Sequence, residues 1–162
     1  MGRCNCPPGP PGPRGPAGGV LSFADFFALM PGDNAAPVAL GADVSFPQNG
    51  PTSGSAITRI SATQFNLAAI GVYQVLFQVS VDEAGQLQLT LNNAPLAYTV
   101  AGRATGTSQI VGIALVQTAV ANSVLTVRNP AGNASALTIT PFAGAPAGTT
   151  PVSAHLTIIH IA

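Results

Sequence analysis

Apolar and polar residues alternate along most of the chain after about residue 20. This alternation is typical of β-strands that bury one face and leave the other exposed. The longest regular run covers residues 72–81, where Gln74 and Gln78 stand on the face opposite the apolar side chains. We therefore expect a strand here whose core face carries Tyr73, Val75, Phe77 and Val79.

Further runs of the same kind are separated by turns rich in Gly, Pro and Asn. Spacings of roughly 8 to 12 residues between short strands are typical of a β-sandwich or barrel. Residues Asp82–Gly85 predict a reversal after the first strand, so we expect an antiparallel meander, with a calcium site at Asp82 and Glu83 as a remote alternative. The other predicted strands cover residues 38–46, 57–67 with a break near Ala62, 86–91, 96–101, 107–116, 123–128, 136–140 and 152–161.

No long helix is expected anywhere in the chain. Residues 22–30 place Phe23, Phe26, Phe27 and Met30 at a helical spacing, which would suit one or two helical turns. The same residues could also enter the sandwich as a strand. Both interpretations stay open from the sequence.

Two predicted strands carry apolar residues on both faces, residues 110–116 and 155–161. A sandwich with a solvated exterior needs apolar residues on one face only, so the outer faces of these strands need cover. Either another subunit or a loop of the same chain could provide it. For the first alternative the candidate interface residues are Ile110, Val111, Ile113, Leu115, His155, Ile159 and Ile161.

Charge is scarce in this chain. Only 6% of its 162 residues are charged, against roughly 25% in an average globular protein, and the five basic residues are all arginines. With formal net charge +0 and no basic cluster, nucleic acids and anionic membranes have no site to bind. A hydrophobic fraction of 47% excludes disorder throughout. A surface with so few charges favours association with other copies, although Ser, Thr, Asn and Gln could also cover it.

The N-terminal segment has glycine at every third position and proline in many of the others. This is the pattern of a collagen triple helix, in which only glycine fits at the axis of three chains. So few triplets cannot hold three chains together alone, so this interpretation requires an adjoining trimeric domain, and the alternative is a stiff linker. We assign residues 1–8 to a connector, 9–20 to a stalk and 21–162 to the β domain, with stalk glycines Gly9, Gly12, Gly15 and Gly18.

The two cysteines, Cys4 and Cys6, lie in the connector. They are too close in sequence to form a relaxed bridge with each other, and no further ligand stands nearby to complete a zinc site. We expect interchain disulfides, with two reduced thiols as the alternative. Near the N-terminus we see no apolar stretch of the kind that a secretory signal requires. The apolar segment at residues 20–30 is too short to span a membrane.

Several segments together resemble the collagen-stalked proteins of bacterial spore surfaces, in particular the exosporium BclA-like group. The resemblance lies in the Gly-Pro-Pro stalk and in residues 23–34, 41–47, 71–77 and 153–161. It implies a ten-stranded jelly roll like that of complement C1q and tumour necrosis factor, assembled as a homotrimer on the endospore surface. It also implies synthesis in the mother cell without a secretory signal. The stalk is short and lacks Thr, which suits a connector that joins trimers into a spore appendage.

The sequence shows no catalytic motif. His155 and His160 have an odd spacing on a strand, so they project to opposite faces and cannot bind one metal ion within a chain. We expect no enzyme activity, cofactor or metal. Two functions remain. The first is a structural trimer, whose partners would be further copies of itself and an exosporium anchor protein. The second is a head that recognises a ligand. The small, neutral loops at residues 101–106 and 143–150 favour the structural role.

Overall fold

The computed structural model describes residues 19–139 and 149–162. The connector with Cys4 and Cys6, the stalk glycines up to Gly18 and the end of the predicted strand 136–140 lie outside the described residues.

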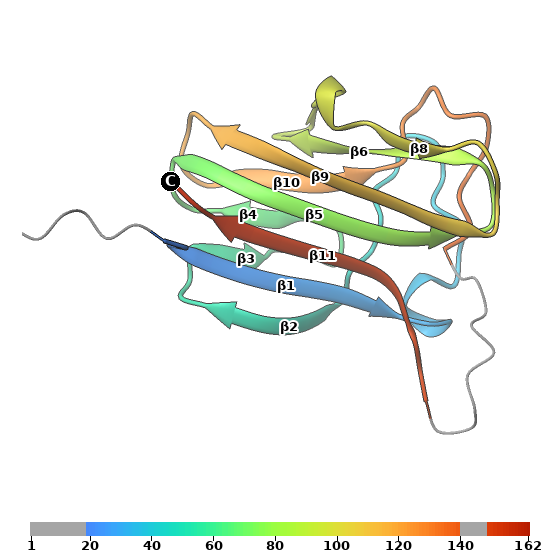
Figure 1. The fold of residues 1–162 in the computed structure, drawn as a ribbon, viewed down its shortest axis with the longest axis horizontal. Helices are drawn as coiled ribbons and strands as arrows, with labels where there is room; N and C mark the ends of the chain where they lie inside the picture. Colours follow the sequence, from blue (N-terminus) through green and yellow to red (C-terminus); the bar gives the residue numbers. More distant parts are fainter. Residues whose placement is uncertain (1–18, 140–148) are drawn as a thin grey trace, which may run out of the picture.

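The described residues form a sandwich of two antiparallel β-sheets (Figure 1). One sheet has five strands in the order β2-β1-β11-β5-β9, and the other has the order β3-β4-β10-β6-β7, with β8 paired to β6. The five-stranded sheet consists of β1 (Ser22–Leu29), β2 (Gln48–Ser53), β5 (Gly71–Val81), β9 (Ser108–Thr118) and β11 (Val152–His160). The second sheet consists of β3 (Ile57–Arg59), β4 (Phe65–Leu67), β6 (Gly85–Leu91), β7 (Ala94–Pro95), β8 (Ala101–Arg103) and β10 (Ser123–Arg128).

The all-β prediction is confirmed, and the helices of the described residues are two 3-10 turns, η1 (Gly32–Asn34) and η2 (Ala97–Thr99). The described strands number eleven rather than the ten that the resemblance implied, and β7 has only two residues. Residues 22–30 resolve to the strand alternative, because Ser22–Leu29 alternates between buried and less buried positions.

The predicted meander after β5 is wrong. β5 pairs with β11 and β9, whereas β6 pairs with β10, β7 and β8 in the other sheet. Residues 82–84 therefore carry the chain from one sheet to the other. The two-residue turn at Asn92 and Asn93, with φ of 51° and 66°, does join paired strands, β6 and β7. Positive φ at both central residues is the geometry that a tight hairpin requires.

Three further strand predictions need correction. Residues 38–46 and 136–139 contribute the isolated bridges Val38↔Leu137 and Asp43↔Arg128 rather than regular strands. Residues 97–99 of the predicted strand 96–101 form η2. β2 was not predicted, because its sequence, Gln48–Ser53, contains Gly and Pro and no apolar alternation. The predicted interruption of 57–67 is present between β3 and β4.

The core lies between the inner faces of the two sheets. Tyr73, Val75, Phe77 and Val79 of β5 are buried there, as are large side chains from both sheets, including Phe26, Leu156, Phe65, Leu87 and Leu125. The rings of Phe26 and Phe65, which come from opposite sheets, have centroids 4.6 Å apart. Burial of each such side chain contributes about 1.5 to 3 kcal/mol, so the two sheets are held by their shared interior.

The ends of the domain lie together. The Leu21 backbone N–H donates to the His160 carbonyl over 2.9 Å, and Ser22 pairs with His160. Figure 1 shows that the chain enters β1 beside the C-terminus, while β5 ends at the opposite end of the sandwich. The described part of the chain therefore begins at the end of the domain that holds the C-terminus.

Candidate subunit interface

The outer face of β9 is an exposed apolar row. Val111, Ile113 and Leu115 are 54%, 64% and 56% exposed. The alternate residues Gly112 and Val116 face the core, and the Phe77 ring lies directly over Gly112 at the position where a side chain would stand. This parity separates exposed from buried positions along the strand.

Ile110 was expected on this outer face, and the structure corrects that prediction. Its side chain is wholly buried in the core. The sequence run at 110–116 is apolar at both parities, so the pattern alone could not say which set turns outward. Ile110 contributes to the stability of the single copy rather than to the exposed row.

Tyr98 extends this row along the free edge of the sheet. β9 is an edge strand, paired on one side with β5 only. The Tyr98 hydroxyl donates to the Leu115 carbonyl on that free edge over 2.9 Å, and the side chain is 67% exposed. We call Tyr98, Val111, Ile113 and Leu115 the β9 patch.

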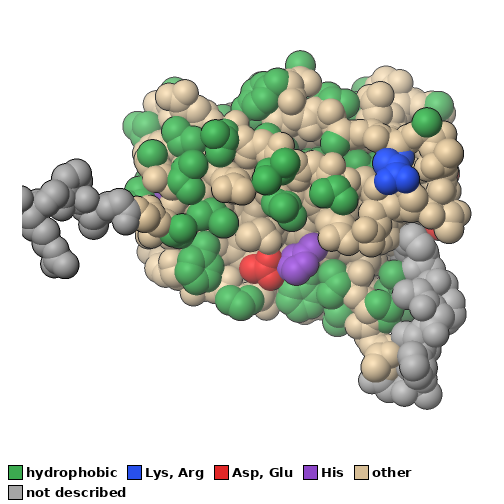
Figure 2. All heavy atoms as spheres, in the orientation of Figure 1, with side chains coloured by type: hydrophobic (Ala, Val, Ile, Leu, Met, Phe, Trp, Pro, Cys, Tyr) green, Lys and Arg blue, Asp and Glu red, His purple; other side chains and the backbone are tan. Residues whose placement is uncertain are grey.

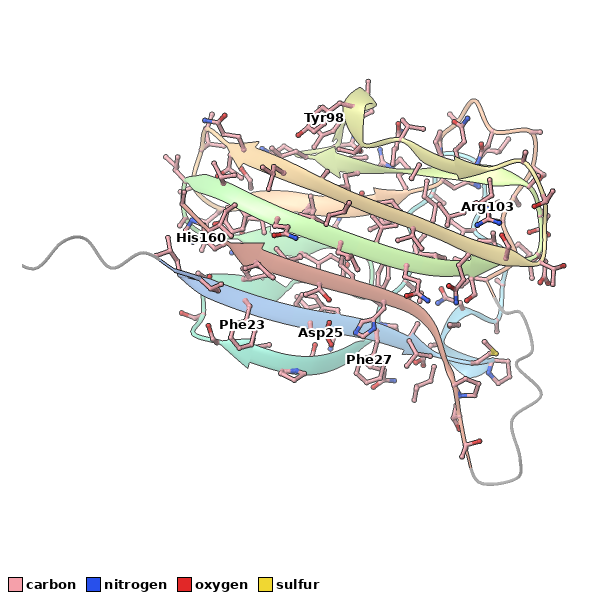
Figure 3. All side chains as sticks on the ribbon, viewed as in Figure 1. Phe23, Asp25, Phe27, Tyr98, Arg103 and His160 are labelled. Carbon is pink, nitrogen blue, oxygen red and sulfur yellow. The ribbon has the colours of Figure 1, made fainter. Side chains whose placement is uncertain are left out.

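A second apolar area covers β1 and β11. Phe23 and Phe27 stand on the outer face of β1, with Asp25 between them, as Figure 3 shows. Phe23 lies opposite Ile159 of β11, and Ile161 follows on the same side, with the last two side chains half-buried. We call Phe23, Phe27, Ile159 and Ile161 the β1–β11 patch.

β5 runs between the two patches. Its outward positions include Gln74 and Gln78, with Leu76 between them, all half-buried. Figure 2 views the molecule from this side and shows apolar side chains spread over the face, with few charged groups among them. The five-stranded sheet thus presents two apolar areas with a more polar stripe in between.

One polar cluster stands inside the β1–β11 patch. His155 Nε2 and Asp25 Oδ2 are 2.8 Å apart, and the Thr157 hydroxyl donates to Asp25 Oδ1 over 2.8 Å. Gly50 of β2 packs against the Asp25 carboxylate so closely that a side chain there would collide with it. Both carboxylate oxygens have partners within the chain, so the cluster could be covered by another subunit with little unmet hydrogen bonding.

The two histidines project to opposite faces, as predicted. His155 lies on the outer face, where its ring meets that of Phe27 edge-on at 6.2 Å. His160 is buried and stacks on Tyr73 with ring centroids 4.4 Å apart. Burial raises the pKa of Tyr73, whose hydroxyl donates to the Ala69 carbonyl over 2.8 Å. No group of three metal-ligating side chains occurs among the described residues.

Sequence reasoning missed part of this surface. The outward row of Phe23, Asp25 and Phe27 was readable as strand alternation, but the helical spacing of the same segment competed with it. Tyr98 carried no signal, because its role depends on the edge of a distant strand. Among the predicted interface residues, the structure places Val111, Ile113 and Leu115 in one patch and Ile159 and Ile161 in the other, with His155 beside the second.

None of the protein-family models and none of the curated proteins matches this chain. Solved structures do resemble it. PRD1 vertex protein P5 has a TM-score of 0.60 at 18% identity, over 90% of this chain and 100% of that one. Murine APRIL has a TM-score of 0.58 at 9% identity, over 86% of this chain and 98% of that one. The globular domain of zebrafish complement 1qA has a TM-score of 0.54 at 14% identity, over 85% of this chain and 94% of that one.

At such low identities the likeness shows the fold. The described domain is a jelly roll of the C1q and TNF-like kind, as the resemblance implied. None of the helices in the described part of the chain is long and apolar enough to cross a membrane.

Proposed function

We propose that this chain is a non-enzymatic structural protein that assembles as a homotrimer through the outer face of its five-stranded sheet. The observation that carries the proposal is the exposed row of Val111, Ile113 and Leu115 on β9. Large contiguous apolar areas on a soluble domain mark interaction surfaces. The chain has too few charges to keep such an area dispersed as a single copy.

A closed ring explains why there are two patches. Contacts of the same kind repeat around a ring when one surface of each copy meets a different surface of the next. The β9 patch of one copy would meet the β1–β11 patch of its neighbour. The Asp25–His155–Thr157 cluster lies within the second patch and needs no partner from the neighbour for its carboxylate.

The number three comes from the N-terminal sequence. Glycine at every third position suits three chains wound together, and a threefold head would bring three such tails side by side. All three would leave the heads at one end, because β1 begins beside the C-terminus. The jelly-roll resemblance likewise implies a homotrimer.

The bacterial endospore surface is the proposed location, and an appendage or filament is the proposed assembly. The support is the resemblance of the stalk and of residues 23–34 and 153–161 to spore-surface proteins. One structural neighbour is named a vertex protein. Cys4 and Cys6 supply thiols that could join one trimer to the next through disulfides.

Sedimentation of the full chain under reducing conditions tests the trimer. We expect a trimer at micromolar concentration, both for the full chain and after removal of residues 1–19, because the proposed interface lies within the domain. A monomer in both cases would overturn the proposed interface. A trimer that needs residues 1–19 would move the association to the tail.

Electron microscopy of the oxidised full chain tests the filament. Wild-type protein should form fibres, whereas the double variant Cys4→Ser with Cys6→Ser should form trimers whose higher assemblies dissociate in denaturant. Fibres of equal resistance in the variant would exclude the disulfides from the assembly. Isolated trimers in both proteins would instead favour the ligand-recognition head.

A further inference from the structure

A hollow of ≈ 310 Å³ lies beside the edge strands β2 and β3, away from the β9 patch. The buried side chains Phe26 and Ile57 contribute to its lining. Its lining also includes the polar residues Asn49, Thr52, Thr58 and Arg59. Its size is at the small end of the range for ligand-binding pockets.

Arg59 is held in place but not neutralised. Its Nε–H donates to Asn49 Oδ1 over 3.0 Å, which orients the plane of the guanidinium. Among the described residues, its two terminal nitrogens have no hydrogen-bond or ion-pair partner. A planar guanidinium with both terminal nitrogens free presents the fork that binds a carboxylate through two parallel hydrogen bonds.

The other arginines of the described residues are engaged differently. Arg128 pairs with Asp43 through Nε at 2.7 Å and through a terminal nitrogen at 3.1 Å. Arg103 reaches the Gln109 carbonyl through a terminal nitrogen at 3.4 Å. Arg59 therefore stands out, because it combines a fixed orientation, a free fork and a hollow.

No acidic residue of the described part of the chain lines the hollow. The Asp25 carboxylate packs against Gly50, which is one of the lining residues. Asp25 stands on the outer face of β1, whereas Phe26 faces inward toward the hollow, so the two lie on opposite faces of the sheet. His155 and Thr157 already occupy the two oxygens of Asp25. The hollow is left with one positive charge and no anion of its own.

We propose that this hollow binds a sugar acid of monosaccharide size, with its carboxylate on the Arg59 fork. The ligand's hydroxyl groups would contact Thr52, Thr58 and the Asn49 amide. Neither threonine hydroxyl has a hydrogen-bond partner among the described residues, so both remain available. The site goes beyond the proposed structural function and would give the assembled heads a means of holding acidic saccharides.

Titration of the ¹⁵N-labelled full chain with glucuronate, followed by two-dimensional NMR, tests the site. We expect saturable shifts of the Arg59 Nε–H and of the Gly50 and Gly54 amides, with much smaller shifts for glucose, which lacks the carboxylate. Arg59→Gln should weaken glucuronate binding at least about tenfold, because a bidentate charged contact is lost. Arg59→Lys should weaken it as well, since a lysine keeps the charge without the fork.

The matched control is Arg103→Gln, which removes an exposed arginine at another place and should leave the binding unchanged. Unshifted amides elsewhere in the spectrum of Arg59→Gln would show that the variant is folded. Absence of saturable shifts in the wild type, or equal binding by Arg59→Gln, would overturn the proposal. Acetate binding as tightly as glucuronate would overturn the assignment to a sugar acid.

Discussion

The two outer faces of the sandwich differ, although their strands alternate in the same way. On the five-stranded sheet the outward positions of β9 are Val111, Ile113 and Leu115. On the second sheet the outward positions of β6 and β10 include Gln88, Thr90, Thr126 and Arg128. The last three are joined through Asp43 in a polar network. The first set of side chains is exposed, whereas Thr90 and Thr126 of the second set are already buried within one copy.

The polar network shows how the second face is completed within one copy. The hydroxyls of Thr90 and Thr126 are 2.7 Å apart, and Thr126 donates to Asp43 Oδ1 over 2.9 Å. Arg128 binds the same carboxylate through two nitrogens, and this hydrogen bonding raises the pKa of Arg128 above its ordinary value. Thr90, Thr126, Asp43 and Arg128 all have partners in the chain, so the network needs none from another copy.

The comparison teaches that alternation specifies the interior, while the residues at outward positions decide what the domain associates with. Both sheets contribute the same kind of inner side chain to one core. Only one of them repeats apolar side chains on its outer face. A variant on each face should therefore affect different properties.

The largest effect is expected from a charge in the β9 patch. Ile113→Asp would place a carboxylate in the proposed interface, where burial without a partner is strongly unfavourable. The trimer should dissociate to folded monomers at micromolar concentration, as measured by sedimentation velocity. Gln88→Asp on the outer face of the second sheet is the control and should remain trimeric. A trimeric Ile113→Asp would remove the distinction between the two faces.

Truncation of the shared interior should affect both faces equally. Phe77→Ala removes a buried ring and should lower the free energy of unfolding by roughly 3 to 5 kcal/mol, measured by urea denaturation at fixed protein concentration. The adjacent Leu76, on the outer face, is the matched control. Leu76→Ala should cost less, and its effect should fall mainly on the assembly. Equal losses of unfolding free energy in the two variants would mean that the inner and outer faces of β5 are wrongly assigned.

The polar network should matter to the stability of one copy. Asp43→Ala leaves Arg128 and Thr126 without their common acceptor and should cost about 1 to 3 kcal/mol in unfolding free energy. Asp82→Ala removes an exposed carboxylate that has no side-chain partner among the described residues, so little change is expected. If the two variants were equally stable, the network would contribute nothing.

The smallest expected effect concerns Glu83, in the turn between the sheets. Burial acts to raise the pKa of Glu83, but hydrogen bonds from the Thr138 backbone N–H and hydroxyl outweigh it and hold the pKa below its ordinary value. A lowered pKa stabilises the folded state above the ordinary value of 4.5, and this contribution disappears as the pH falls through the folded-state pKa.

Glu83→Gln should therefore cost about 1 kcal/mol at pH 7 and progressively less below about pH 4. Urea denaturation of both proteins at pH 7 and pH 3 measures the difference. A difference in unfolding free energy between the two proteins that is larger at pH 3 than at pH 7 would contradict the assigned direction of the pKa shift.

The sequence predicted the fold class because burial imposes a period of two on any strand with one core face. It could not predict which strands share a sheet. The turn after Val81 has the composition of a hairpin, yet it connects the two sheets, because pairing is decided by distant strands such as β10 and β11. The assignment of Ile110 failed for a similar reason: only the position of Phe77 over Gly112 shows which parity faces inward.

The candidate interface was predicted in part, and the Arg59 hollow was not. Strands with apolar residues on both faces are visible in the sequence, so Val111, Ile113 and Leu115 could be found. The hollow instead combines one residue of β1 with residues of β2 and β3 and their connection. Such a combination exists only once the strands have packed.

The close approach of residues 21 and 160 has a practical consequence for protein engineering. In the proposed trimer, a passenger fused after Ala162 would emerge at the end of the head from which the N-terminal segments start. The segment between β8 and β9, at the opposite end of the sandwich, is exposed from Ala104 to Thr107. An epitope inserted there would point away from the end that holds the two termini of the domain, and the proposed trimer would display it three times.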